Sequence, residues 1–209
     1  MPAGLRLVIY DRTCGLRPGS GLPLLTQSWQ LGVTLNRIRG AVDDARGVTT
    51  WGEALDWLVE RAHEQPIAEV QYWGHGKWGC AYVDSERLDA SALKEGHPHH
   101  ARLQALRERM GPEGAWWFRT CETFGADAGH DFAQRWSEFF GGPTLGHTFI
   151  IGPWQSGLHV LGPHDEPGWS MTEGLAQGDP ENPTRALWSS PTAPRTINCL
   201  QGKIPSTFG

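Results

Sequence analysis

The sequence has no long hydrophobic run, because polar, glycine or proline residues interrupt every apolar stretch. A transmembrane helix needs about 18 or more consecutive apolar residues, so we expect no membrane span and no membrane partner. The first apolar run, Leu5–Tyr10, is too short for the core of a signal peptide and lacks a basic leader and a cleavage site. These absences predict a soluble, cytoplasmic protein.

Cysteine is scarce, and no two cysteines form a C-x-x-C pair. The four cysteines are Cys14, Cys80, Cys121 and Cys199. Wide spacing of so few cysteines fits a reduced, cytoplasmic setting better than a disulfide scaffold.

The sequence also lacks an excess of positive charge. It carries 18 Lys and Arg against 23 Asp and Glu, a net charge of -5, with both signs interspersed. Proteins that bind nucleic acids present a basic footprint, so we expect no nucleic acid as a main partner.

Internal repeats and low-complexity tracts are absent too, and what remains is one moderately apolar chain. A length of 209 residues with 39% hydrophobic residues suits one core, so residues 1–209 are predicted to form a single domain. Residues 163–209 contain seven of the fifteen prolines and little periodicity. We expect this region to be an ordered tail packed over the rest, because Trp169, Leu187 and Trp188 need burial.

Apolar strands alternate with helices over residues 5–151. The predicted strands cover residues 5–10, 67–73, 115–120 and 148–151, and residues 80–83 are a short strand or hairpin arm. The predicted helices cover residues 24–39, the segment between the capping box Thr50–Glu53 and Pro66, and residues 101–110 and 127–140. This alternation predicts an α/β fold in which a mostly parallel sheet has helices on both faces.

Two predicted strands end in reactive side chains. The strand over residues 67–73 is followed by Gly74, His75 and Gly76, and the strand over residues 115–120 by Cys121. Functional groups of open α/β sheets gather at the carboxyl ends of strands. If the two strands are neighbours, the imidazole and the thiol face one cleft.

A thiol becomes a good nucleophile when it ionises, and a nearby histidine favours the thiolate or protonates a leaving amine. The helix predicted from Asp127 would favour a negative sulfur through its N-terminal dipole. The N–H of Gly76, together with that of Cys121, would hold an oxyanion. Each residue also has a structural explanation, since His-Gly often forms a turn and a lone cysteine is often a small buried hydrophobe.

An apolar strand ending in His-Gly, followed some 46 residues later by an apolar strand ending in Cys, resembles the caspase–gingipain–metacaspase superfamily. The resemblance covers about residues 5–151 and is closest to caspase-like domains of bacterial proteins. It implies a three-layer caspase-like sandwich. The local sequence around Cys121, Arg-Thr-Cys-Glu-Thr, lacks the caspase signature.

The resemblance implies roles for individual residues. His75 is the acid/base and Cys121 the nucleophile, while Arg119 lines the pocket for the side chain that precedes the cut. Asp11 and Arg12, after the first strand, also contribute. A buried Arg119 would favour an acidic group by bidentate pairing, unless Asp11 neutralises it and leaves a smaller polar pocket.

The loop after the last predicted strand, which builds one wall of the groove in caspase-like folds, contains Trp154 and His159. Trp154 is expected to form an apolar wall that excludes water. A structural role in a turn and short strand is as good an explanation for His159.

Two other patterns have alternative meanings. Residues 74–79 match the dinucleotide fingerprint G-x-G-x-x-G, but they do not open a helix after the first strand. The histidines of segment 97–100 suit a zinc ion, but nothing nearby supplies a clean fourth ligand, and a solvated loop before a helix explains them better.

The sequence therefore predicts a caspase-like cysteine peptidase that hydrolyses amide bonds of a protein or peptide, without a metal or an organic cofactor. The alternatives are a caspase-fold module that binds a peptide or protein with an idle dyad, and a purely structural domain. Substrate, activation and oligomeric state stay open.

Overall fold

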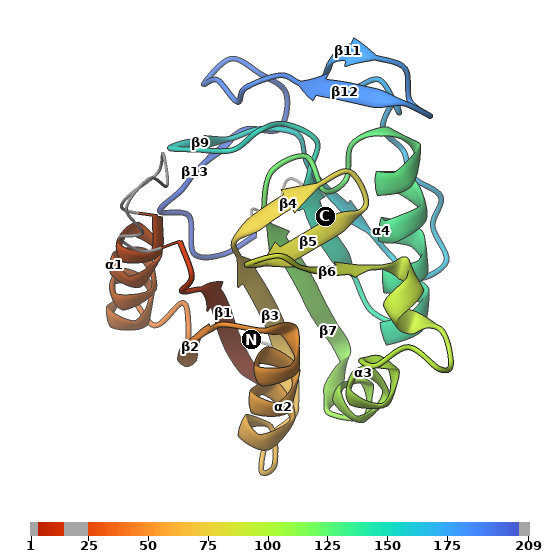
Figure 1. Ribbon diagram of the computed structural model, residues 1–209. Coiled ribbons are helices and arrows are strands. Elements are labelled where there is room, and N and C mark those ends of the chain that lie inside the picture. The colour runs from red at the N-terminus through yellow and green to blue at the C-terminus, as the bar shows by residue number, and fades with distance from the viewer. Residues whose placement is uncertain (1–3, 15–24, 205–209) are drawn as a thin grey trace.

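A six-stranded sheet forms the centre of the computed structural model, which describes residues 4–14 and 25–204 (Figure 1). Its strand order is β10-β8-β7-β3-β1-β2, and all neighbours are parallel except β10 and β8. The strands are β1 (Leu5–Asp11), β2 (Asp44–Val48), β3 (Ile67–Trp73), β7 (Met110–Arg119), β8 (Thr144–His147) and β10 (Leu158–Leu161).

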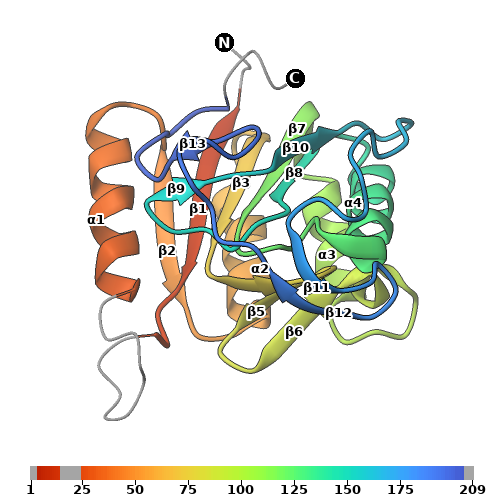
Figure 2. The same cartoon turned by 90° about the horizontal axis from the view of Figure 1, so that it is seen from above.

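Four α-helices of the described residues flank this sheet. They are α1 (Leu25–Ile38), α2 (Trp51–Arg61), α3 (His100–Arg107) and α4 (Ala126–Phe140). Side chains alternate between the two faces of β1, so Leu7 packs in the large core with Leu55 of α2, while Val8 packs with Val33 of α1. Helix α1 lies at the β2 end of the sheet and α4 at the β8–β10 end in both views (Figures 1 and 2). The predicted α/β class, with a mostly parallel sheet, is confirmed.

Periodicity located the longest elements well. Strand β3 covers the predicted residues 67–73, and α4 begins one residue before its predicted start. The capping box is also present at α2, where the side chain of Thr50 accepts a hydrogen bond from Glu53 N (3.1 Å). The Glu53 carboxylate accepts from Thr49 N (2.9 Å), so its bond goes to the residue before the N-cap.

Other boundaries were wrong. The predicted strand over residues 148–151 is observed as β8, Thr144–His147, and Ile150 forms only an isolated bridge with Trp188. The polar residues Thr144 and His147 are fully buried, which hydrophobic patterning does not anticipate. Edge strand β2 was missed for the same reason, since its sequence Asp-Ala-Arg-Gly-Val is polar. The helix predicted over 101–110 ends earlier, because Met110 already pairs with Ile67 in the sheet.

A small antiparallel sheet follows β3 and carries His75. Its strands are β4 (His75–Lys77), β5 (Cys80–Val83) and β6 (Glu86–Asp89), followed by a short 3-10 helix, η1 (Ala90–Leu93). The short strand predicted over 80–83 is therefore correct. This insertion places the residues after β3 over the carboxyl edge of the central sheet.

The C-terminal region has two parts. Its strands are β9 (Trp154–Gln155), β11 (Leu175–Gly178), β12 (Pro183–Ala186) and β13 (Ile197–Asn198). The β11–β12 hairpin stands apart from the sheet at the top of Figure 1. Strand β13 pairs with β9, and Ile197 packs on Trp117.

Burial of the three C-terminal hydrophobic residues was predicted correctly for one of them. Trp169 is buried, but Leu187 and Trp188 are 46% and 68% exposed. Both lie at the end of the β11–β12 hairpin, which leaves them outside the core. In the part of the chain that the structure describes, no helix has the length and hydrophobicity to cross a membrane.

Candidate functional site

His75 and Cys121 follow neighbouring parallel strands. In the register of β3 and β7, Trp73 lies opposite Arg119. His75 comes two residues after Trp73, and Cys121 two residues after Arg119. Both reactive residues therefore leave the central sheet at the same edge.

The hairpin with His75 packs directly on the loop with Cys121. A Cβ atom on Gly76 would lie 2.6 Å from Thr120 Cβ, so the Gly76 backbone touches this loop. Gly79 N donates to Thr123 O (2.9 Å), and Thr123 Oγ1 donates to Cys80 O (3.3 Å). These contacts hold Gly76 beside the Cys121 loop; its role in oxyanion binding stays a prediction.

The two reactive groups have separate neighbours in this structure. The half-buried His75 ring meets Trp29 of α1 edge-on, with ring centroids 6.0 Å apart. The thiol of Cys121 lies 3.9 Å from Ile151 O. Among the hydrogen bonds of the described residues, none joins His75 to Cys121, so their action as a dyad stays a prediction.

The resting thiol of Cys121 is protonated at neutral pH. Burial and, to a lesser extent, the nearby charge of Glu122 raise the pKa of Cys121 to about 11. The N-terminus of α4 follows closely, as predicted, and stabilisation of a thiolate by its dipole stays a prediction.

Arg119 is buried between two indole rings. Its guanidinium carbon lies 4.7 Å from the ring centre of Trp73 and 4.6 Å from that of Trp117, which is cation–π geometry. Burial lowers the pKa of Arg119 to about 10. The side chain stays cationic and 3% exposed.

Partners within the chain occupy most donors of Arg119. Its Nε and Nη2 donate to Gln155 Oε1 (3.2 and 2.8 Å), Nη2 also donates to Cys199 O (3.0 Å), and Nη1 donates to Gln201 O (2.8 Å). Arg119 thus holds β9 and the segment after β13. A substrate contact by Arg119 would require this segment to move, and it stays a prediction.

Arg12 follows β1, as expected, whereas Asp11 is the last residue of the strand and pairs with Val48 of β2. The buried Asp11 carboxylate accepts from Thr13 N and Oγ1 (both 2.7 Å) and from Asp84 N (3.2 Å), so it joins the β1 loop to the β5–β6 turn. The bonded partners of Asp11 and Arg119 in the described residues are different groups. The Arg12 side chain is exposed, and its backbone N donates to Val48 O (3.0 Å).

Trp154 lies on β9 opposite Asn198 and is 44% exposed. Trp188, also exposed, bridges Ile150, which is next to the carbonyl that faces Cys121. The loop beside the thiol is thus flanked by exposed aromatic surface.

Sequence reasoning missed Glu122. This residue is 8% exposed, and its backbone φ of 33° is rare for a residue with a side chain. Burial raises the pKa of Glu122 to about 7, while the charge of Lys77 opposes that rise. A glutamate after a candidate nucleophile was visible in the sequence, but its burial was not.

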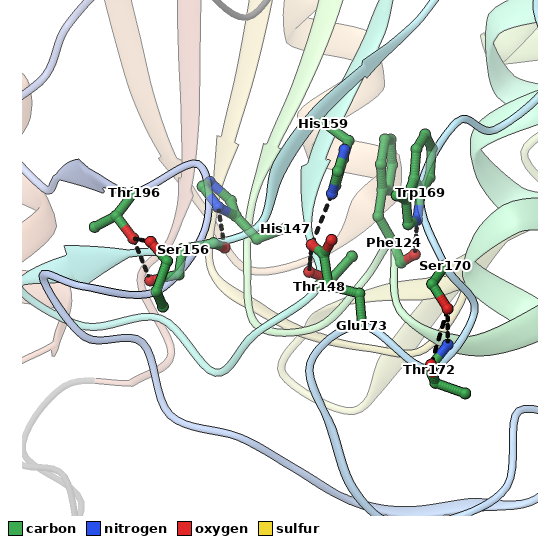
Figure 3. Close-up of polar contacts among 11 residues, drawn as sticks. Phe124, His147, Thr148, Ser156, His159, Trp169, Ser170, Thr172, Glu173 and Thr196 are labelled. Atoms are coloured by element: carbon green, nitrogen blue, oxygen red, sulfur yellow. Dashed lines mark hydrogen bonds and ion pairs between the residues drawn. The ribbon is translucent and has the colours of Figure 1, made fainter.

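A polar cluster surrounds His159 on β10 (Figure 3). His159 Nε2 lies 2.7 Å from Glu173 Oε1, and Thr148 Oγ1 donates to the same oxygen (2.8 Å). The indole of Trp169 stacks on the His159 ring at 4.5 Å and donates through Nε1 to Phe124 O (3.0 Å). The observed contacts tie the 169–173 segment to the sheet.

The remaining sequence patterns have structural placements. Residues 74–79 form β4 and its turn into β5, so they open no helix and lack the context of a dinucleotide site. His99 Nε2 lies 2.8 Å from Glu86 Oε1, and its ring centroid lies 5.5 Å from that of His97. Within residues 4–14 and 25–204, no group of three or more histidine, cysteine or acidic residues is arranged to hold a metal ion.

No family model and no curated protein matches the chain. The fold therefore defines its class: an α/β protein with a mixed, mostly parallel six-stranded sheet flanked by four helices in the described residues.

Proposed function

We propose that the protein is a caspase-like cysteine peptidase of the bacterial type, with Cys121 as nucleophile and His75 as general acid and base. The observation that carries this proposal is the placement of both residues after the neighbouring strands β3 and β7, with the His75 hairpin packed on the Cys121 loop. The substrate is a protein or peptide.

The reaction begins when Cys121 attacks the carbonyl carbon of a peptide bond. The thiol proton passes to His75 as the S–C bond forms, and the backbone N–H groups of Gly76 and Cys121 stabilise the oxyanion. His75 then gives the proton to the leaving amine as the C–N bond breaks. A water molecule, deprotonated by His75, hydrolyses the thioester and restores the thiol. These steps require no metal or organic cofactor.

The raised pKa of Cys121 sets the order of these events. A pKa of about 11 leaves roughly one thiol in ten thousand ionised at pH 7. Proton transfer to His75 therefore accompanies the attack on a bound carbonyl, and the free protein reacts slowly with small alkylating agents.

Covalent trapping tests the proposal. A peptide with an electrophilic ketone is expected to form an adduct with Cys121, detected by mass spectrometry of the intact protein and its peptides. Cys121→Ala should abolish the adduct, and His75→Ala should slow its formation by about 10²-fold or more, the scale of general acid–base catalysis. Cys199→Ala, at another partly exposed free cysteine, is the control and should react normally. Unchanged labelling of His75→Ala would refute the dyad.

A binding module with an idle dyad is the second candidate. The raised thiol pKa and the exposed rings of Trp154 and Trp188 favour it. In that case a peptide would bind equally to the wild type and to Cys121→Ala, without any adduct.

We also propose a cytoplasmic location. All four cysteines are free thiols, which suits a reducing compartment.

A further inference from the structure

Glu122 occupies a constrained backbone position directly after Cys121. Its φ of 33° lies in the left-handed region, where residues with a Cβ atom are strained. Glu122 N donates to Phe149 O (2.9 Å), and Glu122 O accepts from Gly125 N (3.0 Å). Both backbone groups are thus fixed, and the turn holds the carboxyl next to the candidate nucleophile.

The carboxyl of Glu122 is buried and incompletely bonded. The residue is 92% buried, and in the described residues nothing hydrogen-bonds to its Oε2. Leaving a buried acceptor unpaired costs about 1–3 kcal/mol, and most buried polar groups in proteins are paired. An unpaired carboxyl oxygen at this place is explained if a ligand supplies the missing donor.

The charged side chain of Lys77, which acts on Glu122, does not supply this donor. Lys77 on β4 is near enough to stabilise the carboxylate, but its exposed ammonium lies 5.0 Å from the ring centre of Trp78. No ion pair joins Lys77 to Glu122 in the part of the chain that is described. On the other side, the charge of Glu122 acts on the thiol of Cys121.

We propose that Glu122 is a specificity-determining residue. Its free carboxyl oxygen accepts a hydrogen bond from an N–H group in the side chain of the ligand residue that carries the reactive carbonyl. This inference rests on the proposed function, because it takes the ligand to be an acyl compound attacked by Cys121. Either a neutral carboxamide or an ammonium supplies the N–H group. A carboxylate at the same position is repelled.

Glu122 and Arg119 predict opposite preferences. A pocket dominated by Arg119 would select acidic side chains, but its guanidinium already binds Gln155 and two backbone carbonyls. Glu122 carries the unpaired group. The order of reactivity of acidic and amide ligands therefore distinguishes the two residues.

Three peptidyl ketone electrophiles that differ only in the residue before the ketone test this inference. That residue is glutamine, lysine or glutamate, and the rate of Cys121 labelling is measured at pH 7.5 by mass spectrometry. The glutamine and lysine compounds should react about tenfold or more faster than the glutamate compound, as expected for a hydrogen bond to a charged group. A fast lysine compound with a slow glutamine compound would identify the donor as a cation, and the lysine/glutamate ratio is then the one compared in the variants. Equal rates of the glutamine and lysine compounds, both above that of the glutamate compound, would show that any N–H donor suffices, whereas equal rates of all three would overturn the inference.

Glu122→Gln should reduce the difference between the glutamine and glutamate compounds to about threefold or less, because the variant accepts and donates hydrogen bonds without charge. Glu64→Gln makes the same change at an exposed position and should keep the wild-type ratio. If Glu122→Gln does not fold, the labelling rates of the three compounds with Glu122→Asp and with the wild type still test the inference. Fastest labelling by the glutamate compound, or an unchanged ratio in Glu122→Gln, would overturn the inference.

Failure of the inference differs from failure of the proposed function. Labelling of Cys121 that depends on His75 but favours glutamate would leave the peptidase proposal intact and remove the role of Glu122. If no compound labels Cys121, the matching peptide amides are compared by calorimetry, and a preference for glutamine over glutamate that Glu122→Gln abolishes would support Glu122 alone. Equal binding, or no binding, would overturn it.

Discussion

At Gly76 the β4–β5 hairpin packs so closely on the Cys121 loop that no methyl group fits between them. A Cβ atom there would lie 2.6 Å from Thr120 Cβ, and 2.7 Å from Thr120 Oγ1. Residue type at position 76 is therefore fixed by packing as well as by any part in catalysis. The same contact sets the position of His75, the preceding residue in the hairpin.

Gly76→Ala is expected to lower the free energy of unfolding by about 1–3 kcal/mol, the usual cost of forcing an extra carbon into a packed site. Urea denaturation measures the change. Gly52→Ala in α2 is the matched control, because its nearest neighbours lie 3.9 Å away, and it should be neutral or stabilising by up to about 1 kcal/mol. Equal free energies of unfolding of the two variants would show that the hairpin can shift away from the Cys121 loop at no cost.

At the scale of elements, strand β10 and the segment after it are joined by one carboxylate. Glu173 Oε1 accepts a hydrogen bond from Thr148 Oγ1 and also lies within hydrogen-bond distance of His159 Nε2. Burial alone would raise the pKa of Glu173, but these hydrogen bonds and the charge of His159 lower it below 4.5. A carboxyl with a lowered folded-state pKa adds stability above its unfolded pKa and loses it as the pH falls through the folded pKa.

Glu173→Gln should therefore destabilise the protein by about 1 kcal/mol at pH 7, because charged acceptors form stronger hydrogen bonds than neutral ones. The difference from the wild type should shrink as the pH falls below the unfolded pKa and through the lowered folded pKa, below which Glu173 is protonated in both states. Thermal unfolding between pH 3 and pH 7 measures it. Glu166→Gln, at an exposed position of the same region, should show no such trend. A difference independent of pH would exclude an electrostatic role for Glu173.

Elements were predictable where apolar periodicity was strong. Buried β3 and amphipathic α4 satisfy this condition, and both were located from their side chains. Strand β8 contains Thr144 and His147, whose burial depends on tertiary contacts such as the one between His147 Nδ1 and Ser156 O (3.1 Å). Such contacts join residues that no local pattern relates.

At the scale of the whole molecule, the segment around β13 is bound to the sheet by three kinds of contact. Cys199 N donates to Pro153 O (2.9 Å), Ile197 packs on Trp117, and Arg119 donates to the Cys199 and Gln201 carbonyls. The segment is therefore expected to unfold together with the sheet.

Hydrogen exchange tests this expectation. Amides of residues 195–201 should exchange about as slowly as those of β7, because opening them uncovers Trp117 and leaves Arg119 without acceptors. The end of β11 and the β11–β12 turn, residues 176–182 together, are mostly exposed and should exchange much faster. Equal, fast exchange of both segments would show that the C-terminal region is not part of the same cooperative unit.

The candidate site was predictable in part for the same reason. The ends of β3 and β7 followed from apolar periodicity, and His75 and Cys121 were expected at one edge on the condition that the two strands are neighbours, which they are. The environment of Arg119 did not follow, since its acceptors are the Gln155 side chain and two backbone carbonyls, all distant in sequence and related to it by no local pattern. The strain and the free oxygen of Glu122 depend on a turn whose hydrogen bonds involve Phe149 and Gly125.

The acceptors of Arg119 have a consequence for biosynthesis. Gln155 Oε1 lies 36 residues later in the chain, and the two backbone carbonyls lie 80 and 82 residues later. At about 5–20 residues per second, a ribosome needs roughly 4–16 s to add them. During translation the guanidinium must stay hydrated, so the middle of the sheet closes over it only after the nascent polypeptide has supplied those carbonyls.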